Sequence, residues 1–121
     1  LMAPAYAIPR LLARHGLRFE DIAIWEIHEA FAAQVLANIA VASEPGARAK
    51  HAPGYGDLGA FPRERLNLWG GSLALGHPFG ATGARIISQT AHLLQGHPAG
   101  TRAVISICAD GGQGTVLLVE V

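Results

Sequence analysis

Three segments of the chain repeat apolar residues with the spacing of an amphipathic helix, at residues 5–15, 28–39 and 78–94. Gly16 and Gly96 follow the first and the last of these segments and are typical helix stop signals. Pro9 falls inside the first segment. We therefore expect that helix to begin near Pro9 or earlier, with the proline in its first turn.

Three other segments are short, apolar and rich in β-branched residues, which is typical of buried strands: residues 22–27, 103–108 and 115–121. The last two are separated by a glycine-rich turn and predict a closing β-hairpin whose second strand is mostly covered. The first strand is followed at once by the helical pattern from residue 28. A strand that leads directly into a helix is half of an α/β unit, so the pattern predicts an α/β fold.

Two stretches follow neither period. Residues 43–65 contain many prolines and glycines, and we expect a long loop there, which is either a solvated excursion or a functional segment. Residues 67–75 are apolar but interrupted by Gly70 and Gly71, which predicts a bent strand or an irregular approach to the next helix.

Composition limits the class of protein. Half of the 121 residues are apolar, 15% are charged and the formal net charge is zero, so one domain with a sizeable core is expected. The neutral charge gives no attraction to nucleic acid or to an anionic membrane. The apolar runs are too short for a transmembrane helix. The single cysteine cannot form an internal disulfide and fits a reducing compartment.

Three side chains are candidates for chemistry. His77 lies in a glycine-rich turn before Pro78, where the positive end of a helix would favour the neutral imidazole. Cys108 ends an apolar strand and precedes the turn at residues 111–114, whose N–H groups are suited to holding an oxyanion. His28 stands at the junction of strand and helix. A neutral imidazole and a thiol suit proton transfer and nucleophilic catalysis.

Each candidate also has a plainer interpretation. A histidine in a turn often satisfies local backbone groups, and a lone buried cysteine often acts as a small apolar residue. The three side chains are also atoms that zinc accepts, although the paired spacing typical of metal sites is missing, and we expect no metal. The glycines of residues 76–83 are not followed by Lys-Ser or Lys-Thr, so a phosphate-binding P-loop is excluded.

Three blocks, in order, resemble the carboxyl-terminal half of the thiolases. Residues 27–32 look like the Asn-Glu-Ala-Phe-Ala block, and residues 70–85 look like the Gly-His-Pro block of that family. Residues 108–114 look like its Cys-x-Gly-Gly-Gly-x-Gly block. His28 in place of asparagine is similar to the β-subunits of fatty-acid oxidation multienzyme complexes. The resemblance covers nearly the whole chain and implies a mixed β-sheet covered by helices, as one of two similar halves.

The resemblance also implies roles. His77 would activate a nucleophilic cysteine and line an oxyanion hole, and Cys108 would move the proton at the α-carbon of acetyl-CoA. His28 would take over from the asparagine that orients a water at the thioester oxygen. Phe31 would line the acyl pocket. The N–H groups of Asp110 and Gly111 would serve an oxyanion hole, although the Asp110 carboxylate stands where the family has Gly or Ala.

The nucleophilic cysteine of the family belongs to its amino-terminal half and is not in these 121 residues, since Cys108 matches the other cysteine. We therefore expect residues 1–121 to form a thiolase-like carboxyl-terminal domain that is inactive alone. The expected function is cleavage of 3-ketoacyl-CoA by coenzyme A in fatty-acid β-oxidation, with no further cofactor. The alternatives are a non-catalytic module that binds acyl-CoA, lipid or a partner protein, and a half that mainly supplies oligomer contacts.

The expected partners are acyl-CoA, coenzyme A, an amino-terminal thiolase half, a second copy in a dimer or tetramer, and a multienzyme β-oxidation complex. The expected location is the bacterial cytoplasm, or the mitochondrial matrix or peroxisome in a eukaryote.

Overall fold

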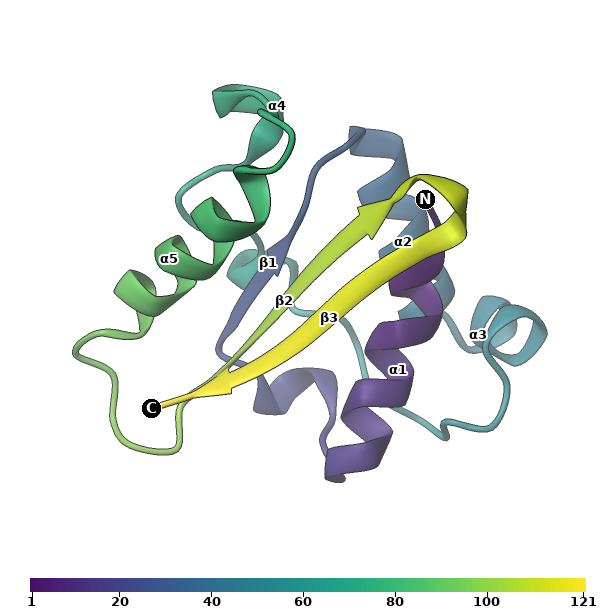
Figure 1. The fold of residues 1–121 in the computed structure, drawn as a ribbon. Helices are drawn as coiled ribbons and strands as arrows, with labels where there is room; N and C mark the ends of the chain where they lie inside the picture. The colour runs from purple at the N-terminus through teal and green to yellow at the C-terminus, as the bar shows by residue number, and fades with distance from the viewer.

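The computed structural model describes residues 1–121 and is built on one mixed β-sheet. Its strands are β1 (Ile24–Ile27), β2 (Arg102–Ala109) and β3 (Gln113–Glu120), in the order β1-β2-β3 (Figure 1). β1 runs parallel to β2, with Ile24 opposite Ala103, and β3 runs antiparallel to β2. The expected α/β fold with a mixed sheet and a closing hairpin is confirmed.

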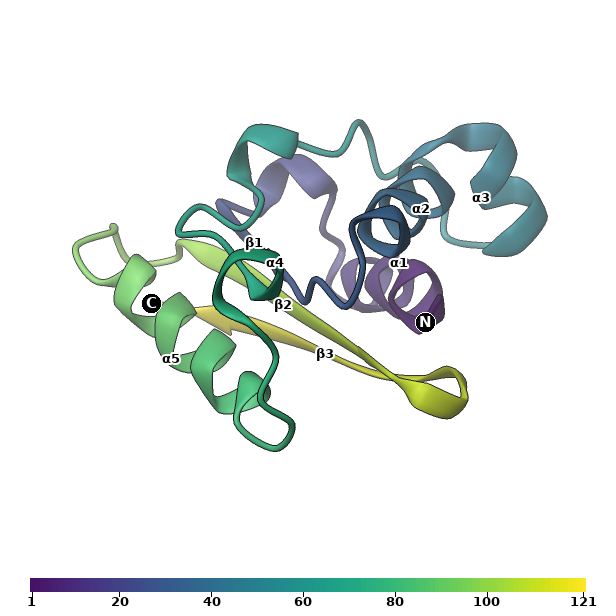
Figure 2. The same cartoon turned by 90° about the horizontal axis from the view of Figure 1, so that it is seen from above.

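The long helices lie on both faces of the sheet (Figure 2). α1 (Ala3–His15) and α2 (Ala32–Ser43) cover one face, and α5 (Thr82–Leu94) covers the other. α3 (Pro45–His51) and α4 (Ser72–Leu75) are short. Three single turns of 3₁₀-helix complete the fold, at Phe19–Asp21, Arg63–Arg65 and Asp110–Gly112. No helix is both long and apolar enough to span a membrane.

The main core lies between the sheet and the pair α1 and α2. Trp25 and Ile27 of β1 and Val104 of β2 point to this side, where they pack with side chains such as Ile8 and Val35. The alternate residues of these strands point to α5. There Ile24 of β1 and Ala103 of β2 form a smaller cluster with Leu94 of α5. This alternation is the period of two that a strand imposes. Both faces of β1 are therefore buried, which explains why apolar residues occupy successive positions in it, Ile24 and Trp25 for example.

All three predicted helices exist, but their first residues differ from the prediction. α1 begins at Ala3 with Pro4 in its first turn, so Pro9 lies in the helix interior and not in its first turn. α2 begins at Ala32 because His28 still donates its N–H to Ser106 O (2.8 Å) and so prolongs the β1–β2 ladder. α5 begins at Thr82, because the segment after Pro78 first forms a turn.

Three other expectations were wrong in part. The segment 43–65 is not all loop, because Pro45–His51 is helical with mostly exposed side chains, which leaves no apolar period to detect. The segment 67–75 is not a strand, and it contains the short helix α4. β3 is largely exposed rather than covered, because α5 packs over β1 and β2 and leaves β3 at the open edge (Figure 2).

Candidate active site

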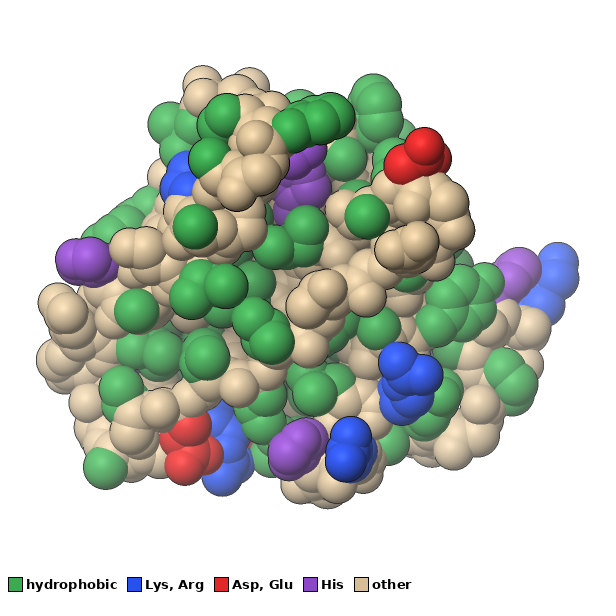
Figure 3. Space-filling model, viewed as in Figure 1, with side chains coloured by type: hydrophobic (Ala, Val, Ile, Leu, Met, Phe, Trp, Pro, Cys, Tyr) green, Lys and Arg blue, Asp and Glu red, His purple; other side chains and the backbone are tan.

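A cavity of about 530 Å³ opens at the carboxyl ends of the parallel strands β1 and β2. His28 follows β1 and Cys108 lies near the end of β2, while His77 comes from the turn before α5; all three line this cavity. Phe31 and Asp110 line it as well. Figure 3 shows histidine side chains among hydrophobic ones in a hollow beneath α4. The two imidazoles and the thiol therefore meet at one cavity, while their catalytic roles stay predictions.

His28 is buried, with only 2% of its surface exposed, and its Nδ1 lies 3.1 Å from Ser72 Oγ. Burial lowers the pKa of His28 below its ordinary value, and the charges of His77 and Arg85 lower it further. The Glu29 carboxylate opposes this effect. The ring is therefore held as a neutral imidazole near physiological pH.

Hydrogen bonds of Glu29 and Asn67 place Ser72 beside His28. The Asn67 side chain pairs with the backbone of Ile27 at the end of β1 (2.9 and 3.0 Å) and also donates to Glu29 Oε1 (2.7 Å). Glu29 Oε2 in turn accepts the N–H of Leu73 in the first turn of α4 (3.1 Å). These bonds dock α4 on the end of β1, so Ser72 faces His28 across 44 residues of sequence.

His77 stands beside His28, with ring centroids 4.3 Å apart and planes tilted by 48°. Its Nδ1 lies 2.7 Å from Thr82 Oγ1, at the first residue of α5. The Phe79 ring also lies beside His77, with ring centroids 4.6 Å apart. After burial, the charge of the neighbouring His77 is the next cause that lowers the pKa of His28.

Cys108 is buried in β2 opposite Gly114 and is the free cysteine of the chain. Burial raises the pKa of its thiol. The group is therefore a protonated thiol at neutral pH, which suits a proton donor better than a standing nucleophile.

The turn after Cys108 differs from the simple oxyanion hole expected for it. Asp110 lines the cavity, but Gly111 does not, and the Gly111 N–H donates to the Asp110 carboxylate (2.8 Å). Gly111 has a positive φ of 75°, a conformation that suits glycine. The Asp110 side chain therefore occupies one of the two N–H groups that we expected to hold an oxyanion.

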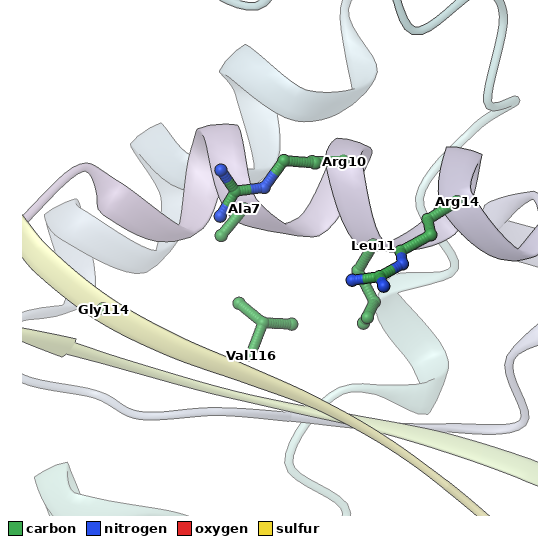
Figure 4. Close-up of a pocket in the computed structure, with 6 residues that line it drawn as sticks. All are labelled: Ala7, Arg10, Leu11, Arg14, Gly114 and Val116. Carbon is green, nitrogen blue, oxygen red and sulfur yellow. The ribbon is translucent and has the colours of Figure 1, made fainter.

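Two observations bear on other sites. Nowhere in the chain do three His, Cys, Asp or Glu side chains form a group able to hold a metal ion, so the zinc alternative for His28, His77 and Cys108 finds no support. A second hollow, of about 240 Å³, lies between α1 and β3. Figure 4 shows Arg10 and Arg14 reaching along it. Its lining has no nucleophile or general base, so it is not the candidate active site.

The family model described as "Thiolase, C-terminal domain" matches residues 1–121. The chain belongs to the thiolase family. This thiolase domain is 48% identical over 120 residues to a protein of Caenorhabditis elegans described as "Probable 3-ketoacyl-CoA thiolase", with 99% of the chain and 27% of the relative aligned. It is 42% identical to the mitochondrial trifunctional enzyme subunit beta of Rattus norvegicus, with 99% of the chain and 25% of the relative aligned.

A solved structure agrees with this assignment. The thiolase domain matches the crystal structure of the Acat5 thiolase from Ascaris suum in complex with coenzyme A, with a TM-score of 0.72 and 37% identity. The match covers 98% of the domain and 26% of the Ascaris chain. The domain thus spans about a quarter of the length of the relatives that it matches.

The sequence motifs identified the two imidazoles and the thiol of the cavity, but not the residues whose side chains hydrogen-bond to the imidazoles or orient them. Ser72, Thr82 and Arg85 lie inside the Gly-His-Pro block, yet nothing in their spacing distinguishes them from scaffold residues. Glu29 is structural in a specific sense, because it docks α4 on β1.

Proposed function

We propose that this thiolase domain contributes the proton-transfer side of the active site that cleaves 3-ketoacyl-CoA with coenzyme A. The observation that carries the proposal is the single cavity lined by His28, His77 and the protonated thiol of Cys108. The two imidazoles can donate or accept a hydrogen bond, and the Cys108 thiol can give a proton to a carbanion. Cleavage of a carbon–carbon bond next to a thioester requires both functions.

The proposed reaction runs in two stages. A cysteine thiolate from outside this chain attacks the 3-keto carbon; the bond between C2 and C3 breaks, and the electron pair goes to C2 of the departing acetyl-CoA. Cys108 gives its proton to that carbon, and a hydrogen bond from His28 supports the thioester oxygen. The thiol of coenzyme A then attacks the acyl group and gives its proton to the Cys108 thiolate, which restores the Cys108 thiol. The enzyme sulfur leaves as a thiolate and takes back the proton that His77 accepted from it at the start.

The nucleophile comes from elsewhere in this scheme, because the 121 residues contain one cysteine and its thiol serves as the acid. We propose that an amino-terminal thiolase half supplies it and that the domain alone does not turn over. Exposed apolar side chains around the cavity support such a partner: Phe31 is 63% exposed and Phe79 is 87% exposed. Burying these two side chains against an amino-terminal half would remove apolar surface from water.

Further parts of the proposal rest on the relatives. We propose that the complete protein assembles as a dimer or tetramer and works within fatty-acid β-oxidation, including within a multienzyme complex. A bacterial cytoplasm, a mitochondrial matrix or a peroxisome suits that role. Phe31 is the proposed wall of the acyl pocket, because it lines the cavity without being locked in the core.

The test is a thiolysis assay on the complete protein that carries this domain, with a 3-ketoacyl-CoA and coenzyme A. We expect turnover that falls by at least about 10²-fold in His77→Ala and in Cys108→Ala, the scale of a lost general acid or base. His51→Ala is the matched control, since His51 is exposed on α3 and does not line the cavity. Full activity of both site variants, or no cleavage by the parent protein, would exclude the thiolase mechanism.

A second candidate function follows from Asp110. Its carboxylate lines the cavity and occupies the Gly111 N–H, where a negative charge opposes an oxyanion. A domain arranged in this way would bind acyl-CoA without cleaving it. Binding of a 3-ketoacyl-CoA by the complete protein without turnover favours this second function, and rapid thiol-dependent cleavage excludes it.

A further inference from the structure

Each histidine of the cavity has its Nδ1 atom held by a hydroxyl group. Ser72 Oγ lies 3.1 Å from His28 Nδ1, and Thr82 Oγ1 lies 2.7 Å from His77 Nδ1. A hydroxyl has one proton to give and lone pairs to accept with, so its other partner decides the direction of each bond. Those other partners differ between the two residues.

The Thr82 hydroxyl has its proton committed elsewhere. Its Oγ1 lies 3.2 Å from the carbonyl oxygen of Pro78, a group that only accepts hydrogen bonds. Thr82 therefore donates to Pro78 and accepts from the Nδ1–H of His77. This assignment leaves His77 Nε2 without a proton, so the ring nitrogen that remains for a ligand is a lone pair.

The Ser72 hydroxyl is in the opposite situation. Arg85 Nη2 donates to Ser72 Oγ at 3.2 Å, and a guanidinium group only donates. Ser72 makes no other side-chain hydrogen bond than those to Arg85 and His28. Its proton is therefore directed at His28 Nδ1, and the proton of the neutral His28 ring resides on Nε2.

We propose that Ser72 and Thr82 are positioning residues that hold two adjoining imidazoles in opposite tautomers, so that His28 presents an N–H and His77 presents a lone pair to one cavity. The catalytic meaning of this arrangement rests on the proposed function. A thioester oxygen needs a donor, and a cysteine thiol needs an acceptor, so one ring serves each partner without any proton rearrangement.

Arg85 fixes the direction of the Ser72 bond. Its Nη1 donates to Gln89 Oε1 (3.0 Å) one turn along α5, and the Gln89 amide donates to Glu26 Oε1 and to Gly70 O (both 3.3 Å). Arg85 forms no direct ion pair with a carboxylate. The guanidinium thus keeps the Ser72 oxygen engaged as an acceptor, and its charge disfavours a second proton on His28.

The charged surroundings of His28 agree with a ring that stays neutral. Burial and the charges of His77 and Arg85 lower its pKa, and the Glu29 carboxylate opposes them. The other titratable groups near the ring are Glu26, two residues earlier on β1, and the two cavity residues Cys108 and Asp110. The buried Glu26 has its pKa raised to about 7, so its opposing negative charge is weakened at neutral pH.

The direct test is ¹⁵N NMR of the histidine rings in the complete protein, with His28→Asn and His77→Asn used to assign the signals. We expect the His28 ring to show a protonated Nε2 and the His77 ring a protonated Nδ1. Observation of the same tautomer in both rings of the parent protein overturns the proposal, whether or not any variant folds. This readout needs no turnover, so it is separate from the fate of the proposed function.

Matched variants then test which residues set the tautomers. Ser72→Ala should mix the His28 tautomers and lower kcat on the order of 10-fold to 100-fold with little change in KM, while Ser72→Thr should retain the Nε2–H signal. Thr82→Val should mix the His77 tautomers, and Thr82→Ser should retain them. Unchanged ring signals in Ser72→Ala and Thr82→Val contradict the assignment. Correct tautomers in a protein that does not cleave 3-ketoacyl-CoA would reject the function and keep the hydrogen-bond assignment.

Discussion

The carboxylate of Glu29 fills the space that a side chain on Gly71 would need. A Cβ built on Gly71 overlaps the carboxyl group of Glu29, including its Oε1 at 2.9 Å. The same carboxylate accepts the N–H of Leu73 and the side-chain N–H of Asn67. The absence of a side chain at residue 71 is therefore what allows α4, and Ser72 with it, to lie against the end of β1.

Gly71→Ala should displace Glu29 and loosen the docking of α4. We expect a loss of unfolding free energy of about 2 kcal/mol, the scale of overpacking at a buried site, together with lower activity. Gly46→Ala is the control, because a Cβ there meets no atom within 4 Å and residue 46 lies in the helix α3. The control should be neutral or slightly stabilising. Equal urea midpoints for the Gly71→Ala variant and the parent protein would show that α4 docks in another way.

Glu26 should make the stability of the protein depend on pH in an unusual direction. Burial raises the pKa of Glu26 from 4.5 to about 7, against the opposing effects of Gln89 and Arg85. Between these values the folded protein keeps a proton that the unfolded chain releases, so the unfolding free energy falls as the pH rises. The contribution is fully present below pH 4.5 and is lost above about pH 7.

Glu26→Gln removes this titration while keeping the side-chain shape. The variant's unfolding free energy minus that of the parent should rise between pH 4.5 and 7 and then level. The rise should be at most about 3.4 kcal/mol, for a pKa raised from 4.5 to about 7 at 1.36 kcal/mol per pKa unit. His28 acts in the opposite direction, because its lowered pKa costs stability as the pH falls below 6.5, but it is present in both proteins and cancels. A difference that is constant with pH would show that Glu26 is ionised normally.

Cys108 should react slowly with alkylating agents at neutral pH. Burial raises its thiol pKa above 9.0, and the thiolate is the reactive form. Mass spectrometry of the peptide that carries Cys108 should show slower labelling by iodoacetamide than for glutathione, with a rate that still increases through pH 9. Rapid labelling that levels off near pH 7 would mean that Cys108 is a thiolate and does not supply a proton.

Asp110 should restrain turnover if the cavity develops an oxyanion near it. Asp110→Asn keeps an acceptor for the Gly111 N–H and removes the charge, whereas Asp110→Gly removes both. We expect kcat for 3-ketoacyl-CoA to rise in both variants, on the order of tenfold for Asp110→Gly, which corresponds to about 1.4 kcal/mol of barrier. A fall in kcat for both variants would show that the carboxylate assists the reaction instead.

Part of the fold followed from local patterns. The buried strand at residues 22–27 and the hairpin around residues 103–121 were predicted because apolar runs and glycine-rich turns act over a few residues. The helix at Pro45–His51 was missed because its side chains are mostly exposed and carry no apolar period. The start of α2 was misplaced because the bond from His28 N–H to Ser106 O joins residues far apart in sequence.

The sequence by itself determined which chemical groups the thiolase domain has. His28, His77 and Cys108 were identifiable because their motifs lie at the ends of elements, where side chains can face a cavity. Only the tertiary structure decided that the His28 imidazole meets the Ser72 hydroxyl, because the two residues are 44 positions apart in sequence. That contact depends on the docking of α4 by Glu29 and on the hydrogen bond from Arg85, and no local pattern records either of them.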